Sequence, residues 1–376
     1  MKSELRLLSL GILSLSLFTH ALTACINTSY SRLDEIEITD DLLPLILGAF
    51  PHHGAAFYEH EIIRTRKILK SSPKQFEARN DLGSAYTKLK KWKFAQAEFE
   101  GNEKLHPSRY ETSSNLGVMF KKKGDYAQAE KYIAQALGIK PGGHMGLGDY
   151  YLKMIQWLAG TQSQDIIEKN FLGIRYNAGP EATAKVANEE YVVTLIKNDY
   201  QFPDAYVVLG DILFTRGDYQ LALRAYHRAQ SLIKPTQRPN FYPSVIEGRY
   251  DNINTIWDNN KTPEHVIERG RGMDQIYEEF DAAKNWLNQF QKIELQFIQQ
   301  GKATPFKVIL AEMENQNLLL PTVLEAGFYK GSAEEPSHDY FDPFSIIASI
   351  VILLTLLAVI IVSLWVTFRY IARRLS

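Results

Sequence analysis

The sequence predicts an all-α fold: a solenoid of stacked helical hairpins, followed by a single transmembrane helix near the C-terminus. Two observations predict it. One pattern of residue types occurs twice between residues 76 and 143 at a spacing of 34 residues, and residues 344–368 contain no charged side chain. Repeats of this length are typical of hairpin arrays, because a single hairpin cannot bury its apolar face without neighbours.

The repeats keep small, aromatic and proline residues in register. Glycine and alanine permit two helices to approach closely, and proline ends a helix because it lacks a backbone N–H. A third copy at residues 203–236 keeps this register, but its closing Pro235 comes one place late. The matching positions are Leu82-Gly83, Tyr86, Trp92, Ala95 and Pro107 in residues 76–109, Leu116-Gly117, Phe120, Tyr126, Ala129 and Pro141 in residues 110–143, and Tyr206, Leu209-Gly210, Ala222, Tyr226 and Ala229 in residues 203–236.

The pattern resembles the tetratricopeptide repeat (TPR), although the first aromatic residue of that motif is missing in the first two copies. The clear copies cover roughly a third of the chain. The resemblance implies pairs of antiparallel helices whose first members line a concave face. It also implies a binding role rather than an enzymatic one, with a protein or peptide as the partner in the concave groove.

The same resemblance selects candidate residues for that groove. Asparagine can bond both the N–H and the C=O of an extended peptide, and lysine can meet a carboxylate. The TPR clamp for a terminal carboxylate is incomplete here, since no lysine stands near Asn80 and no asparagine near Ser84. The alternative is that these positions are merely solvated helix faces. The candidates are Asn80, Ser84, Thr87, Lys88, Asn115, Val118, Lys122, Asp211 and Phe214.

Residues 1–24 are predicted to be a secretory signal peptide of the lipoprotein type. A basic start is followed by an apolar run that is too short to span a bilayer well. The run ends in Leu-Thr-Ala before Cys25, which resembles the bacterial lipobox. Cys25 is therefore the predicted lipidation site. Cleavage near Ala21 or Ala24 without lipid, and an uncleaved anchor, are the alternatives.

The solenoid is predicted to occupy residues 52–235, after a tether or irregular lead-in at residues 25–51. A helix at about residues 55–70 is expected to cap the array as a degenerate half-repeat. Between the second and third clear copies the 34-residue register fails. Irregular helices are therefore expected there, at about residues 165–176 and 180–198.

Residues 236–320 are predicted to form a helical extension that closes the array. Its main helix is expected at residues 273–300, where an apolar heptad stripe runs until it fails at Glu294. Two interpretations of the stripe remain open, namely packing against the last repeat and a dimer seam, so self-association is possible. The stripe consists of Ile276, Phe280, Ala283, Leu287 and Phe290.

The C-terminal part is predicted to be a stalk at residues 321–343, a transmembrane helix at residues 344–368 and a basic tail at residues 369–376. At about 1.5 Å per residue the uncharged run reaches ~37 Å, which is enough to span a bilayer with some tilt. Three arginines in the tail favour a cytoplasmic location for it. The sequence therefore predicts a single-pass protein of the bacterial inner membrane, with the solenoid in the periplasm.

The chain shows no motif for catalysis or for a cofactor. The formal net charge is −1 and no basic stripe is interleaved with aromatics, so nucleic acid is not an expected partner. A single cysteine excludes an intramolecular disulfide and a zinc ribbon. His52, His53 and His60 are weak candidates for metal ligands. The alternative places these histidines in a turn and on an exposed helix face.

These features together predict a membrane-anchored scaffold or adaptor that binds a peptide or protein partner in an extracytoplasmic envelope complex. Two alternatives remain open. The chain can be an accessory lipoprotein for assembly or secretion that recruits an integral membrane partner. It can also be a periplasmic sensor that uses the histidine cluster to bind a metal or haem.

Overall fold

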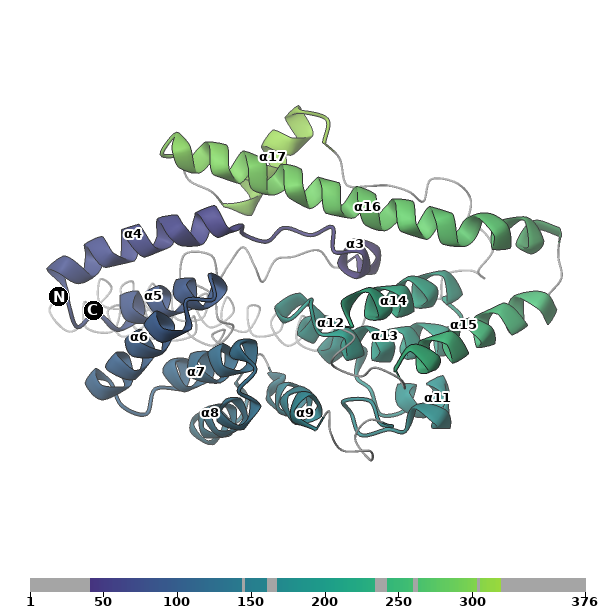
Figure 1. The fold of residues 1–376 in the computed structure, drawn as a ribbon, viewed down its shortest axis with the longest axis horizontal. Coiled ribbons are helices and arrows are strands. Elements are labelled where there is room, and N and C mark those ends of the chain that lie inside the picture. Colours follow the sequence, from purple (N-terminus) through teal and green to yellow (C-terminus); the bar gives the residue numbers. More distant parts are fainter. Residues whose placement is uncertain are drawn as a thin grey trace, which may run out of the picture. The chain divides into compact units, whose positions relative to one another are not determined.

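The computed structural model describes residues 41–143, 146–160, 168–233, 242–259, 263–302 and 305–318 (Figure 1). Within these ranges the regular structure is helical, apart from one isolated bridge between Lys169 and Arg175. The α-helices are α3 (Leu42–Leu47), α4 (Ala55–Ser71), α5 (Phe76–Lys88), α6 (Trp92–Leu105), α7 (Tyr110–Lys123), α8 (Tyr126–Ile139), α9 (Gly148–Ala159), α11 (Pro180–Ala184), α12 (Glu189–Asn198), α13 (Pro203–Arg216), α14 (Tyr219–Leu232), α15 (Tyr242–Asn259), α16 (Pro263–Gln299) and α17 (Phe306–Asn315).

The three predicted repeats are helical hairpins, α5–α6, α7–α8 and α13–α14, and the members of each pair pack on each other. The motif glycines permit this contact. A Cβ atom on Gly83 would lie 2.5 Å from Cε1 of Phe99, and one on Gly117 would lie 2.6 Å from the Ile133 side chain. At Gly210 the same atom would overlap the Tyr226 ring. In every pair the opposing residue is 16 positions later, so the register predicts the packing partner as well as the glycine.

The hairpin turns differ although their motifs align. Gly124 and Gly217 adopt left-handed backbone conformations, with φ of 88° and 93°, whereas Lys90 takes φ of 57° at the corresponding turn of the first hairpin. Asp125 caps α8, since its side chain accepts a hydrogen bond from the Gln128 N–H. Asp218, at the same position before α14, makes no such capping hydrogen bond. It pairs with Arg216 instead.

The predicted lead-in at residues 25–51 is structured in its described part. Residues 42–47 form α3, which packs on both α14 and α16. Leu45 and Ile46 are fully buried, and Asp41 caps the helix through the Leu43 N–H. The expectation of an irregular tether is therefore wrong for these residues. The apolar run Leu42–Leu47 supplies core side chains, while α4 packs on α5 as the expected cap of the array.

The region between the second and third hairpins is less helical than expected. α9 packs on α8, but described residues 168–175 form turns and the bridge where a helix was predicted. The predicted helix at 180–198 is divided into α11 and α12. The division has a local cause, because the Asn188 side chain accepts from the Tyr191 N–H and starts a new helix.

The long C-terminal helix is confirmed, and it begins earlier than predicted, at Pro263. The apolar stripe on α16 packs against other elements as well as the last repeat. Ile276 belongs to the main apolar core, whereas Ala283 and Phe290 join a second cluster with residues of α3 and α17. Figure 1 shows α16 passing α3 and α4, and contacts to both are present. The stripe is thus buried within one chain, which favours array closure over a dimer seam.

Glu294 interrupts the stripe because it is the partner of a buried histidine. Its Oε1 pairs with Nδ1 of His53, and its Oε2 accepts a hydrogen bond of 2.8 Å from the Gly54 N–H. Near the middle of α16, Glu279 pairs with Arg224 of α14. A buried histidine–glutamate contact and a buried ion pair therefore attach α16 to the residues before α4 and to α14 of the third hairpin.

Within the described ranges, no helix is both long and apolar enough to cross a lipid bilayer. The predicted signal peptide, Cys25, stalk, transmembrane helix 344–368 and tail lie outside the described residues.

Candidate functional site

The structure brings together the groove candidates of the first two hairpins. Asn80 and Ser84 lie on α5, and Asn115 and Val118 lie on α7, at helical spacings of three or four residues. α5 packs beside α7. The two helices are also linked by Thr112 of α7, whose hydroxyl lies 3.5 Å from Oδ1 of Asn80. We call the surface formed by Asn80, Ser84, Thr87, Lys88, Asn115, Val118 and Lys122 the α5–α7 face.

Most of the α5–α7 face is more buried than a solvated surface would be. Ser84 is fully buried, and Asn80, Asn115 and Val118 retain 7%, 6% and 5% of their exposure. Only Lys122 is exposed, and Lys88 is half-buried. The interpretation as merely solvated helix faces is therefore wrong for the central residues of this face.

Two polar atoms of this face are buried without a hydrogen-bond partner: Nδ2 of Asn80 and Oγ of Ser84. The neighbouring Thr87, in contrast, satisfies its hydroxyl by donating to the Gly83 carbonyl at 2.9 Å. A buried polar group without a partner costs about 1–3 kcal/mol, and such groups are uncommon in folded proteins. The α5–α7 face therefore holds a donor and a hydroxyl that an added chain could satisfy.

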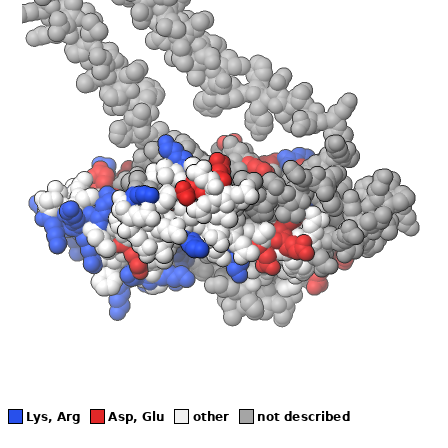
Figure 2. All heavy atoms as spheres, turned by 90° about the horizontal axis from the view of Figure 1, so that it is seen from above, with Lys and Arg blue, Asp and Glu red and all other residues white. Residues whose placement is uncertain are grey.

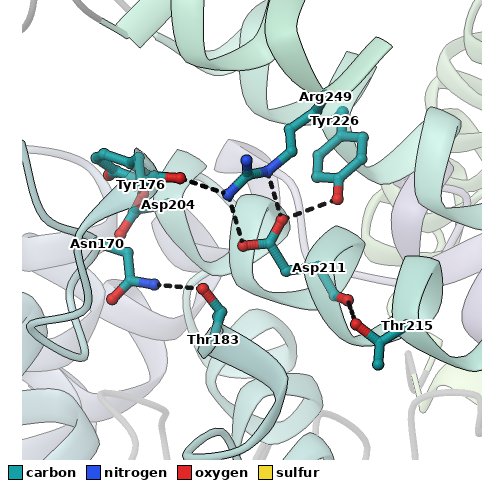
Figure 3. A network of polar contacts seen from close by, with 8 residues as sticks. All are labelled: Asn170, Tyr176, Thr183, Asp204, Asp211, Thr215, Tyr226 and Arg249. Carbon is teal, nitrogen blue, oxygen red and sulfur yellow. Dashed lines mark hydrogen bonds and ion pairs between the residues drawn. The ribbon is translucent and has the colours of Figure 1, made fainter. Parts of the chain in front are cut away.

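The third hairpin uses the equivalent helix differently. Asp211 of α13 is fully buried. Its Oδ1 accepts from the Tyr226 hydroxyl and from Nε of Arg249, both at 2.8 Å, and its Oδ2 accepts from Nη2 of Arg249 at 3.2 Å (Figure 3). The carboxylate is occupied inside the protein. Phe214, the other candidate on α13, is also buried, with its ring 5.5 Å from that of Tyr219.

The network around Asp211 extends to the loop before α11. Arg249 donates to the Tyr176 carbonyl at 3.1 Å, and the Tyr176 hydroxyl donates to Asp204 at 2.5 Å (Figure 3). Asp204 also accepts from the Phe171 N–H. The network thus fixes α15 and residues 168–178 against α13. Sequence reasoning missed Arg249 and Tyr176, because their partners lie 38 and 28 positions away and no local pattern marks them.

The titration behaviour of the network is that of a structural site. Burial, followed by the charge of Asp211, raises the pKa of Tyr226 well above its ordinary value, so this phenol stays protonated and donates. Burial lowers the pKa of Arg249, but the charge and hydrogen bond of Asp211 outweigh it, and the pKa is raised overall.

A buried ion pair joins the second hairpin to the irregular region. Lys121, at the end of α7, pairs with Asp199, which follows α12. Burial lowers the pKa of Lys121, and the adjacent Lys122 acts in the same direction. Lys121, the first of three consecutive lysines at the end of α7, is therefore a contact inside the array rather than part of a solvated helix end.

The three histidines have separate environments. His53 is buried against Glu294 and stacks on Phe57, with ring centroids 3.5 Å apart. His52 packs on Tyr200, and its Nδ1 lies 3.1 Å from the Phe50 carbonyl. His60 is exposed on α4. His60 lies on an exposed helix face, as the alternative to a metal site expected. His53 is instead a buried residue.

No group of three or more His, Cys, Asp and Glu side chains is placed to hold a metal ion in the part of the chain that the structure describes. The weak metal candidates His52, His53 and His60 therefore belong to no such group among the described residues.

Comparison with known families agrees with the hairpin geometry. Residues 110–142 and residues 186–237 each match a family model of the tetratricopeptide repeat. The first match covers α7 and α8, and the second covers α12, α13 and α14, so it begins one helix before the third copy seen in the sequence. The search of curated proteins returned no match. The described part of the chain is therefore an all-α array that contains tetratricopeptide repeats.

Proposed function

We propose that this protein is an interaction scaffold that binds a segment of a protein partner on the α5–α7 face. The observation that carries the proposal is the pair of unsatisfied groups one turn apart on α5, the first helix of the first repeat, Nδ2 of Asn80 and Oγ of Ser84. An extended peptide offers backbone C=O and N–H groups at the spacing that such side chains need.

The side chains of the α5–α7 face have the hydrogen-bonding groups that a bound peptide chain needs. Asparagine at two adjacent helices, Asn80 and Asn115, presents amides that can hold a peptide backbone in either direction. Lys122 stands exposed at the end of the same face, where it can meet a carboxylate. Since the central residues are buried, binding requires the α5–α7 face to open, and a few kcal/mol of binding energy would be spent on that opening.

Site-specific photocrosslinking tests the proposal. A photoreactive amino acid in place of Lys122 should crosslink a discrete partner in cells. The same amino acid in place of Gln135, which is exposed on α8, serves as the matched control. The Lys122 adduct should lose most of its intensity in an Asn80→Ala background. Equal adducts from both positions, or an Asn80→Ala variant with undiminished adduct, would contradict the assignment of the α5–α7 face.

The proposal includes the location suggested by the sequence. An uncharged run at 344–368 followed by an arginine-rich tail supports a single-pass inner-membrane anchor, with the array in the periplasm. Protease added to spheroplasts should then remove the array and spare the tail. Complete protection until lysis would reverse the topology.

The N-terminal signal supports a second attachment through a lipid on Cys25. Mass spectrometry of the mature protein should find a diacyl or triacyl cysteine as the first residue. An N-terminus that retains Met1, or an unmodified Cys25, would remove the lipid from the proposal and leave the scaffold function untouched.

A further inference from the structure

A second surface with its own chemistry lies on α4, the end of α5 and the start of α6. Its centre is a row of three side chains from three helices. Nη2 of Arg66 lies 2.5 Å from the Tyr86 hydroxyl, and the guanidinium also faces the Tyr86 ring at 5.7 Å. The Phe94 ring also lies near Tyr86, with ring centroids 5.4 Å apart. Arg66 and Phe94 are exposed, and Tyr86, which contacts both, is buried.

Two large apolar side chains at or near this row are exposed to solvent. Phe94 is 59% exposed, and Ile63, one turn before Arg66 on α4, is 69% exposed. These are the two largest exposed fractions among the large apolar side chains that the structure describes. Ile63 lies on α4 and Phe94 on α6, and both helices pack on α5, which carries Tyr86.

The surroundings are strongly basic. Residues 63–70 and 86–94 contain no aspartate or glutamate. Arg64 and Arg79 are neutralised by Glu61 and Glu98. Lys67, Lys90, Lys91 and Lys93 are exposed and form no ion pair with described residues. Figure 2 shows Lys and Arg side chains gathering at the end of the view where α4 to α6 lie.

We propose that this surface, named here the Arg66–Phe94 surface, docks an acidic peptide segment of a protein partner that carries an aromatic or aliphatic side chain between its carboxylates. Carboxylates complement the unpaired lysines and the guanidinium, and the apolar side chain covers Phe94 and Ile63. Arg66 is already held by Tyr86, so little side-chain freedom is lost on binding.

The geometry favours a peptide over a lipid surface. A membrane-binding surface needs apolar side chains that project into the acyl boundary. The Phe94 ring instead lies along the Tyr86 ring at an interplanar angle of 33°. It presents a flat contact next to a cation, which suits the side chain of a peptide.

Fluorescence anisotropy with full-length protein tests the proposal. The probe is a labelled synthetic peptide of glutamate and aspartate with two phenylalanines, compared with the same peptide lacking phenylalanine and with a lysine analogue. Only the acidic, phenylalanine-containing peptide should bind tightly, and its affinity should fall with added salt. The Phe94→Ser variant and the double variant Lys91→Glu with Lys93→Glu should each weaken binding about tenfold.

The second hairpin supplies a matched control. Ile139→Ser with Lys131→Glu changes an exposed apolar residue and an exposed lysine on α8, and binding should stay within about twofold of the unmodified protein. Circular dichroism verifies that the exposed substitutions keep the fold. The Asn80→Ala variant should bind the peptide normally, which separates this surface from the α5–α7 face.

Three results would overturn the proposal. One is the absence of saturable binding by the acidic, phenylalanine-containing peptide. Another is equal affinity in the patch variants and in the α8 control. The third is displacement of the peptide by phosphatidylglycerol vesicles but not by phosphatidylcholine vesicles, which would assign the surface to lipid.

Discussion

The first and third clear repeats, α5–α6 and α13–α14, have the same hairpin packing but different inner faces. Gly83 packs against Phe99 and Gly210 against Tyr226, 16 residues later in both cases. On the third repeat, however, Asp211 is occupied by Arg249 and Tyr226, while the α5–α7 face retains unsatisfied groups. The repeat motif therefore determines how two helices meet, and neighbouring segments determine whether the inner face is used for structure or is left for a partner.

The largest expected effect comes from breaking the ion pair of the third repeat. Arg249→Leu leaves the buried Asp211 carboxylate without its cation, and the free energy of unfolding should fall by about 3–5 kcal/mol. Urea denaturation measures this loss. Adding Asp211→Leu should restore part of the stability, because the uncompensated charge is removed as well. A single variant as stable as the unmodified protein would show that the network does not hold α15 in place.

Adding a methyl group at the three motif glycines sharpens the comparison. Gly83→Ala, Gly117→Ala and Gly210→Ala should each cost about 1–3 kcal/mol through overpacking. Gly210 should show the largest loss, because Tyr226 is fixed by its bond to Asp211 and cannot move aside. Thermal and urea unfolding provide the values.

The control for these variants is Gly138 on α8, where an added Cβ meets nothing within 4 Å. Gly138→Ala should stabilise the protein by roughly 0.5–1 kcal/mol, because alanine is the better helix former. Losses at Gly138 equal to those at the motif glycines would remove the packing explanation.

A pH titration examines the junction between the lead-in and the third repeat. Burial lowers the pKa of His52 to about 4, against its backbone hydrogen bond to Phe50, which raises it. Between pH 6.5 and about 4, His52 is therefore protonated in the unfolded chain but not in the folded chain. Stability should fall by about 2 kcal/mol as the pH is lowered through this window, after allowance for partial exposure.

The substitution His52→Phe should flatten that part of the pH profile, since phenylalanine keeps the contact with Tyr200 and cannot be protonated. His60→Gln, at an exposed position, should leave the profile unchanged. An unaltered slope in His52→Phe would assign the pH dependence to other groups.

The smallest effect is expected on the α5–α7 face. Ser84→Ala removes a buried hydroxyl that has no hydrogen-bond partner, so stability should change by less than about 1 kcal/mol and can increase. A loss of several kcal/mol would mean that Ser84 supports the fold rather than a partner.

The sequence predicted what depends on local spacing. The glycine and alanine register placed all three hairpins, and Pro73 and Pro107 lie just beyond the ends of α4 and α6. It failed where burial depends on partners far along the chain. Glu294 looked like the end of an apolar stripe, yet it is the partner of His53, 241 positions earlier. Asp211 looked like a groove residue, because nothing nearby reveals Arg249.

The lead-in was missed for a related reason. Leu42–Leu47 is too short to show helical periodicity, and it is helical because α14 and α16 cover it. The residues of the α5–α7 face lie on helices that pack side by side, as the repeat register implies, but their burial could not be predicted from one sequence.

The most direct test of the account compares Asn80→Ala with Asp211→Ala in the same two assays, urea unfolding and crosslinking from position 122. Asn80→Ala should keep its unfolding free energy within about 1 kcal/mol and lose the adduct. Asp211→Ala should lose about 3–5 kcal/mol, because Arg249 is left buried without its carboxylate. Loss of stability in both variants, with the adduct falling in proportion, would contradict the division between a binding face on α5–α7 and a structural one on α13.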